Sequence, residues 1–389
     1  MQEIQEQIQH KEISCFKVFE SQNISEIEEA LNSTLYVPEA PLKPRIIFEI
    51  LHYLKLKFEL KKYPINSYIA TNENGICGMV ICQLDPHYTS YSRKCGTFGW
   101  LNAESLEVCE ELMSQCASFV RKNKFRKLRG PINCPKSLGG IGHQVEGFEW
   151  PMLYGVAYTD PTSRILDYLV RLGYIKESQY SCVRVDQAAW ANGKKVDKDI
   201  RLELVDIEGF VSHKEEILNL GKDSFHEILP DASGRQERFD EFVYAYSEVP
   251  KANHLLPEGF DFYEHSDNPH FIETWENCDI ERIIPIAPLA FDRHTGELVG
   301  ALLGLPDIFE AWLGKKITRA NADTAMVRKD YTNKGIFSAM NNVGQQTARF
   351  LGWKYFEGTS IWSNNSHAID TIFPHCTPIR KHYIVQKRV

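Results

Sequence analysis

Apolar positions along the chain follow two spacings in turn, and these spacings predict alternating strands and helices. In the first half, a period of two predicts strands over Ser67–Ala70 and Ile76–Gln83, joined by a hairpin turn at Asn72–Gly75. Helical spacing predicts an amphipathic helix over Leu106–Lys122. Strands that alternate with helices, together with antiparallel hairpins, indicate a mixed α/β sheet.

The second half repeats this order. The pattern predicts a hairpin formed by Ile283–Phe291 and Leu298–Gly304, followed by a strand over Ala322–Val327. A helix over Ile336–Leu351 and a second strand over Tyr355–Ile361 come next. Residue identity between the halves is low, so the repeat is one of pattern.

Residues 46–61 fit more than one prediction. The stretch 54–61 alternates with period two, as a half-buried strand does, whereas the residues before it have helical spacing. This segment either packs on its domain with one solvated face or forms an amphipathic element bound to a surface. The positions with helical spacing are Ile46, Ile47, Ile50, Leu51 and Leu54.

A polar stretch near the midpoint predicts a division into two domains. Residues 191–199 are polar and contain one glycine, Gly193, so we interpret them as a linker. The expected domains are residues 1–190 and 200–389, and both have an ordinary domain size. The last strand of the second domain is expected at Tyr383–Gln386.

Composition narrows the class of protein. The 389 residues carry a net charge of −8, which argues against a general nucleic-acid binder. The first residues show no apolar signal segment, and no apolar run approaches the roughly 20 residues that span a bilayer. Ten cysteines without a C-x-x-C pair indicate free thiols in a reducing cytoplasm. The histidines lack metal-binding spacing, so no metal is expected.

The most informative segment joins a strand to a helix. The apolar strand Ala322–Val327 runs into the polar turn 328–335, which contains Gly335 and precedes the helix from Ile336. Backbone N–H groups at such a helix N-terminus can bind a diphosphate. The turn lacks the Gly-Lys-Ser/Thr ending of a P-loop and is not a G-x-G-x-x-G turn.

This order of hairpin, strand, turn, helix and second strand resembles the GNAT family of N-acyltransferases. In that family, acyl-CoA lies where the two strands splay apart, and its diphosphate sits on the turn. Thr332 and Phe337 depart from the family's pattern, which has a long polar residue first and a small residue last. The loop residues that the resemblance assigns to the cofactor are Asn333, Lys334, Gly335, Ile336 and Phe337.

The first half is also similar to a GNAT domain, and proteins built from two such domains are known in this family. Four stretches carry the likeness: 85–91, 96–100, 129–133 and 146–148. At the position of its turn, Leu101–Glu107 contains no glycine and no basic residue, and two carboxylates would repel a diphosphate. We therefore expect that the first half does not bind acyl-CoA in the usual way.

The resemblance also implies roles for residues around the second strand pair. Asp323 and Glu357 are the candidates for the catalytic base, and a raised pKa would suit Asp323 to that role. Asp323 could instead be a strand-edge aspartate bonded to backbone. The N–H of Met326 or Val327 is the expected donor to the thioester oxygen.

Asn365 either contacts the pantetheine arm of acyl-CoA or caps a helix. The general acid has no clear candidate, and Ser366 and His367 are substitutes for it.

Two functions are expected from these residues. The first is acyl transfer from acetyl-CoA or another acyl-CoA to an amine on a small molecule or peptide, with the cofactor on the C-terminal domain. The alternative is a binding or scaffold protein that retains the fold without catalysis, which Thr332, Phe337 and the acidic turn of the first half favour.

Overall fold

The structure is a computed structural model that describes residues 16–185, 196–224, 229–264, 266, 269–365 and 376–389. The candidates Ser366 and His367, and the segment after Asn365 that would form the helix it caps, lie outside this part of the chain.

Strands of both halves form one mixed sheet, which confirms the predicted α/β class. Its strand order is β1-β2-β3-β6-β7-β15-β9-β14-β13-β12-β11-β10, with β8 paired to β15. Neighbours pair antiparallel except β6 with β7 and β13 with β14, which are parallel. Each half therefore contributes one parallel pair.

In the first half, helices cover both faces of the sheet. α3 and α5 enclose one apolar cluster with Phe98 and Leu112, and α1 and α2 pack on the other face through residues such as Ile27 and Ile50. The strands are β1 (Lys17–Ser21), β2 (Ile65–Asn72), β3 (Gly75–Gln83), β4 (Thr89–Ser90), β5 (Arg93–Lys94), β6 (Gly96–Ala103), β7 (Lys127–Gly130), β8 (His143–Glu146) and β9 (Ile175–Arg184). The helices are α1 (Ile24–Thr34), α2 (Lys43–Leu60), α3 (Leu106–Lys122), α4 (Lys136–Gly139) and α5 (Ile165–Arg171).

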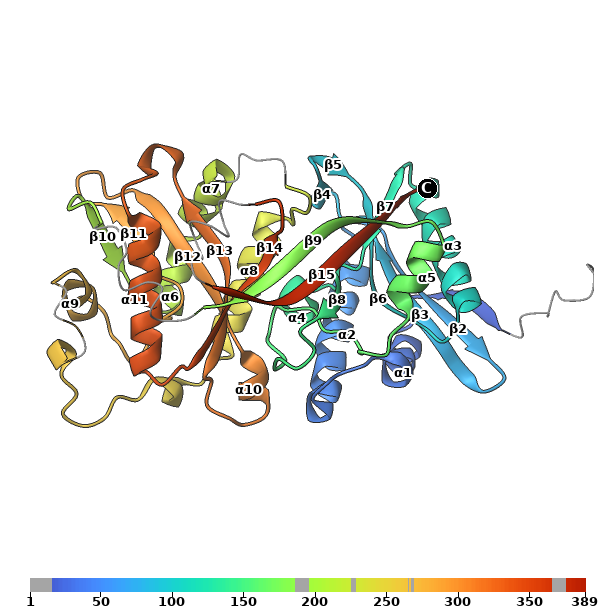
Figure 1. Cartoon of the computed structure of the whole chain (residues 1–389), viewed down its shortest axis with the longest axis horizontal. Helices are drawn as coiled ribbons and strands as arrows, with labels where there is room; N and C mark the ends of the chain where they lie inside the picture. The colour runs from blue at the N-terminus through green and yellow to red at the C-terminus, as the bar shows by residue number, and fades with distance from the viewer. Residues whose placement is uncertain (1–15, 186–195, 225–228, 265, 267–268, 366–375) are drawn as a thin grey trace, which may run out of the picture.

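In the second half, α11 covers one face, and α6, α7 and α8 cover the other (Figure 1). The strands are β10 (Ile200–Glu203), β11 (Leu289–Asp292), β12 (Leu298–Pro306), β13 (Arg319–Val327), β14 (Tyr355–Trp362) and β15 (Thr377–Arg388). The helices are α6 (Ile207–Ser212), α7 (Lys214–Ser224), α8 (Arg235–Ser247), α9 (Pro269–Glu276), α10 (Ile308–Trp312) and α11 (Ile336–Phe350).

Residues 46–60 of the ambiguous segment belong to the single helix α2, and Lys61 caps its C-terminal end. Its helical spacing buries Ile46, Ile50 and Leu54 against the sheet, while Leu56 and Leu60 remain exposed. The period-two alternation of residues 54–61 therefore reflects the exposed end of a helix and not a strand.

The last strand crosses from one half to the other. β15 lies between β7 and β9, and its partners Gly130, Gln144 and Cys182 all belong to the first half. β9 in turn pairs with β14 of the second half, so β9 and β15 run side by side across the middle of the molecule (Figure 1). The linker at 191–199 and the domains 1–190 and 200–389 stay predictions, but the chain does not pair its strands within these limits.

Buried side chains of β15 should make the C-terminal residues essential to stability. Ile384 is fully buried among residues of the first half, including Ile132, Ile141 and Tyr180. We expect Ile384→Ala to lower the free energy of unfolding by about 2–5 kcal/mol, because it leaves a cavity. Urea unfolding followed by tryptophan fluorescence measures this change. Ile175→Ala, at a position of β9 that is 57% exposed, is the control and should change little.

Two buried histidines beside this strand should make stability depend on pH. Burial lowers the pKa of His143 on β8 and of His382 on β15 from 6.5 to about 4. At a pH between about 4 and 6.5, the two histidines are protonated in the unfolded chain but neutral in the folded protein. The free energy of unfolding should therefore fall as pH decreases from about 6.5 to about 4. Each histidine contributes about 1.4 kcal/mol per pH unit at most.

The control for this pH dependence is a matched pair of variants. His143→Gln with His382→Gln should flatten the slope, and His52→Gln, at an exposed position of α2, should leave it unchanged. If the free energy of unfolding depends on pH as steeply in the double variant, the pH dependence does not come from His143 and His382.

Candidate functional site

The opening between β13 and β14 is the centre of the candidate site. The two strands pair from Arg319 with Tyr355 as far as Ala322 with Gly358. Beyond this point β13 continues along β12, while β14 continues along β9, where Ile361 pairs with Ser181. The strands therefore diverge, and a cavity of about 480 Å³ lies beside the divergence. We call this cavity the cleft.

Residues of the first half form part of the cleft wall. Lys136, Tyr180 and Thr89 line it together with the segment Leu229–Ser233 of the second half. Thr89 and Ala232 exchange two backbone hydrogen bonds of 2.9 and 3.0 Å, which fix this segment in place. The side chain of Asp231 is buried, and its carboxylate accepts hydrogen bonds from the Arg129 guanidinium (2.6 and 2.7 Å) and from the Tyr180 hydroxyl (2.6 Å).

Asp323 lies in the cleft, as predicted, but its environment differs from the expected one. Its carboxylate accepts hydrogen bonds from Arg238 of α8 (2.7 Å) and from the Thr324 hydroxyl (2.8 Å). Burial alone would raise its pKa, but the charges of Arg238 and Lys136 oppose this effect, and the pKa of Asp323 is lowered overall. The expectation of a raised pKa is therefore wrong, and Asp323 is held as an ionised carboxylate.

Glu357 does not face the cleft, which corrects the second prediction for the base. It is fully buried on β14, and its carboxylate accepts hydrogen bonds from Arg380 of β15 (2.8 Å) and from the Tyr355 hydroxyl (2.7 Å). The two opposite charges hold β14 to the crossing strand. In the sheet, Glu357 lies between Asn321 of β13 and Arg184 of β9.

The register of β13 distinguishes the two candidate backbone donors. The Arg328 N–H donates to the Val299 carbonyl of β12 at 2.9 Å. Because N–H groups alternate in direction along an antiparallel strand, the Met326 N–H points to β12 and the Val327 N–H points to the opening. The direction of its N–H therefore favours Val327 as donor, although Met326 lines the cleft and Val327 does not.

The turn before α11 contains two residues with a left-handed backbone, and its residues lie outside the cleft lining. Asn333 and Gly335 have φ values of 65° and 73°, in the left-handed region. The ammonium of Lys334 lies 4.4 Å from the Tyr331 ring centre and 4.0 Å from Asp197. Ile336 is buried in the core under α11. Asn333, Lys334, Gly335 and Ile336 are thus close to the cleft in sequence without lining it.

Phe337 and Asn365 do line the cleft. Phe337 is half-buried on the first turn of α11, so the departure from the expected small residue places an aromatic ring at the cleft wall. Asn365 follows β14, and its backbone N–H donates to the Trp362 carbonyl at 2.8 Å.

The corresponding opening in the first half is filled by the chain itself. β6 and β7 pair only at Gly96 with Leu128 and at Thr97 with Arg129. Beyond them, the Trp100 N–H donates to the Asn133 side-chain oxygen at 2.8 Å. The cavity beside Trp100 measures only about 70 Å³. This filling supports the prediction that the first half does not take acyl-CoA in the usual way.

Sequence reasoning missed the charged residues that enclose Asp323. Arg238 bonds Asp323 on one side and Glu241 on the other, and Glu241 accepts the backbone N–H groups of Lys136 (3.1 Å) and Ser137 (3.0 Å). Burial raises the pKa of Glu241 and lowers that of Lys136. The i, i+3 spacing of Arg238 and Glu241 was the one visible signal, but it is also typical of an ordinary exposed helix face.

The described part of the chain shows neither a candidate metal-binding group nor a candidate membrane-spanning helix. No group of three or more potential ligands for a metal ion occurs among these residues. None of the helices seen there combines the length and the apolar character that crossing a bilayer requires.

Solved structures share this architecture over almost the whole chain. A tandem GNAT protein from the clavulanic acid biosynthesis pathway, solved without AcCoA, superposes with a TM-score of 0.52 at 10% identity, covering 96% of this chain and 98% of that chain. A GCN5-related glucosamine N-acetyltransferase region of a fungal multi-domain β-N-acetylglucosaminidase gives a TM-score of 0.50 at 11% identity and covers 96% of this chain and 38% of that chain. No protein-family model and no curated protein sequence matches. The chain therefore has the fold of a tandem GNAT protein.

The placement of Glu357 leads to a stability prediction. Glu357→Gln leaves the Arg380 charge buried without a counter-charge, so we expect a loss of about 3 kcal/mol or more in the free energy of unfolding. Glu146→Gln is the matched control, because it breaks an exposed ion pair with Lys381, the neighbour of Arg380 on β15. The loss in the free energy of unfolding should then be less than about 1 kcal/mol. Equal losses in urea unfolding would contradict the assignment of Glu357 as a buried structural charge.

Proposed function

We propose that the protein is an acyl-CoA-dependent N-acyltransferase whose C-terminal half holds the acyl-CoA, with acetyl-CoA as the first candidate. The observation that carries this proposal is the divergence of β13 from β14 beside a cleft of about 480 Å³. The N-terminus of α11, a helix of 15 residues, follows the same strand and supplies N–H groups for a diphosphate. The free cysteines fit a cytoplasmic protein.

The chemistry would use groups on β13. The Val327 N–H polarises the thioester oxygen, as the register of the strand allows. The acceptor nitrogen forms a bond to the thioester carbon, the C–S bond breaks, and the proton lost by the nitrogen passes to the CoA thiolate. Asp323 is a weak base because its pKa is lowered. We therefore assign it to pass this proton on through water without remaining protonated itself. Asn365 would contact the pantetheine arm.

The turn residues would hold the diphosphate. Asn333 and Gly335 in left-handed conformations turn the backbone at the start of α11, and Lys334 adds a positive charge. Ile336 anchors the helix in the core, which fixes the direction of its first N–H groups.

A non-catalytic binding protein is the second candidate. Phe337 lines the cleft where a small residue would let the diphosphate approach closely. Arg238 neutralises Asp323 at 2.7 Å, which weakens it as a base. If acetyl-CoA does not bind to the full-length protein at millimolar concentration in a calorimetric titration, the scaffold is the better assignment.

A substitution in the turn tests the proposed cofactor site. Gly335→Glu places bulk and negative charge beside the diphosphate and strains a backbone with φ 73°, so acetyl-CoA binding should be abolished. Gly314→Glu is the matched control, because Gly314 has φ 70°, open space around it, and a position before the opposite end of β13. This control should bind acetyl-CoA like the unchanged protein. Retained binding in Gly335→Glu would show that the turn is assigned wrongly.

A further inference from the structure

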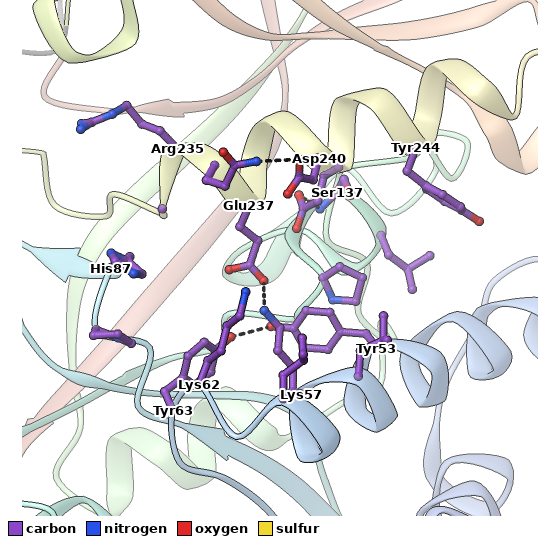
Figure 2. A pocket seen from close by; sticks show the side chains of 18 of the residues that line it. Tyr53, Lys57, Lys62, Tyr63, His87, Ser137, Arg235, Glu237, Asp240 and Tyr244 are labelled. Atoms are coloured by element: carbon purple, nitrogen blue, oxygen red, sulfur yellow. Dashed lines mark hydrogen bonds and ion pairs between the residues drawn. The ribbon is translucent and has the colours of Figure 1, made fainter. Parts of the chain in front are cut away.

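A second cavity, of about 760 Å³, lies between α2 of the first half and the helices α7 and α8 of the second (Figure 2). This volume suits a small molecule. The cavity adjoins the cleft, because Leu218 and Arg235 line both. On the opposite wall, Lys136 lines the cleft, and its neighbours Pro135 and Ser137 line the cavity. An occupant of the cavity would therefore meet the cleft at Arg235.

Contacts between the halves hold the walls of this cavity in place. The ammonium of Lys57 on α2 lies 2.7 Å from the Glu237 carboxylate on α8. It also lies 4.9 Å from the ring centre of Tyr53 and 5.0 Å from that of Tyr63. Because these residues are fixed to each other before any ligand arrives, a ligand would bind a preformed site.

Aromatic and basic side chains both line the cavity. Figure 2 shows Tyr53 and Tyr244 on one side, with Arg235, His87 and Lys62 on the other. Leucine and tyrosine side chains extend the apolar wall, which suits an aliphatic or aromatic group. The further apolar and aromatic residues that line the cavity are Leu56, Leu60, Leu138, Tyr154 and Leu218, together with Tyr63, which lies beside Lys62 (Figure 2).

Among the basic residues that line the cavity, Lys57 is paired with Glu237, whereas three others have no carboxylate nearby in the described part of the chain. Arg235, Lys62 and Lys222 have no carboxylate within 4.0 Å among the residues that the structure describes. The four carboxylates that line the cavity, by contrast, all have partners. Glu49 pairs with Arg45 (2.8 Å), Glu237 with Lys57 (2.7 Å), Asp240 with Lys214 (3.8 Å), and Glu241 with Arg238. The site is therefore complementary to an anionic group.

From this arrangement we propose that the cavity binds the acceptor, and that the acceptor is an amino acid with an aromatic or large aliphatic side chain. The carboxylate lies on Arg235, the side chain lies among the tyrosines and leucines, and the amino group points into the cleft. An amine and a carboxylate attached to the same carbon fit the site, because Arg235 lines both the cavity and the cleft. The reaction of this amine rests on the proposed function, but its binding does not.

Calorimetry without acetyl-CoA tests the binding. L-Phenylalanine should bind to the full-length protein, as should L-tyrosine or L-leucine. 2-Phenylethylamine, which lacks the carboxylate, should bind about tenfold more weakly or worse, because it loses a charge-assisted hydrogen bond. Equal affinity for L-phenylalanine and 2-phenylethylamine, or no binding of any of the three amino acids, would overturn the proposal.

Charge reversal at Arg235, where the cavity meets the cleft, tests whether this residue binds the carboxylate of the acceptor. Arg235→Glu should weaken L-phenylalanine binding at least about tenfold. The fold should be retained, since Arg235 is an exposed first residue of α8 and an acidic side chain suits a helix N-terminus. Lys55→Glu, at an exposed position of α2 that does not line the cavity, is the control and should bind normally. Unchanged binding in Arg235→Glu would remove Arg235 from the site.

Separate titrations distinguish the failure of this inference from that of the proposed function. If L-phenylalanine binds through its carboxylate while acetyl-CoA does not bind, the cavity is assigned correctly and the acyltransferase is not. If acetyl-CoA binds and none of the three amino acids does, the acyltransferase stands and the acceptor assignment falls. If both bind, release of the CoA thiol should require the amino acid.

Discussion

The pairing of β9 with β14 is the constraint on which the rest of the structure depends. β9 belongs to the first half, yet it takes the position beside β14 and pairs with it at Ile361 and Trp362. At the same level of the sheet, β13 remains on β12. β14 cannot follow both neighbours, so the two strands part after Ala322 and Gly358. The cleft of the second half thus owes its opening to a strand of the first.

The same constraint explains why the last residues of the chain complete the first half. With β9 committed to β14, the space between β9 and β7 is filled by β15, whose Ile384 and Val385 complete apolar clusters of the first half. The buried pair of Arg380 and Glu357 then links the crossing strand back to β14. The two halves are therefore one folding unit in their central strands.

Each half has an opening where its two parallel strands diverge, but only the opening of the first half is filled by the chain. In the first half, the chain after β7 returns over the opening, and Asn133 satisfies the Trp100 N–H. In the second half, the equivalent space is bordered by Lys136, by α8 and by Asp323, and charged groups line it. Because Arg238 bonds both Asp323 of the cleft and Glu241 of the second cavity, α8 links the charged groups of the two.

The sequence by itself determined most of the order of strands and helices, with α2 as an exception, and it placed a turn at Gly335, because these features follow from local spacing and from glycine's freedom at positive φ. It also placed Asp323 beside the opening through its position on the strand. The pKa of Asp323, the turning of Glu357 toward Arg380 and the contribution of Lys136 were decided only in the tertiary structure. These depend on partners far apart in the chain, such as Arg238 and Asp323, which lie 85 residues apart. Burial and charge at such contacts leave no periodic signal in the sequence.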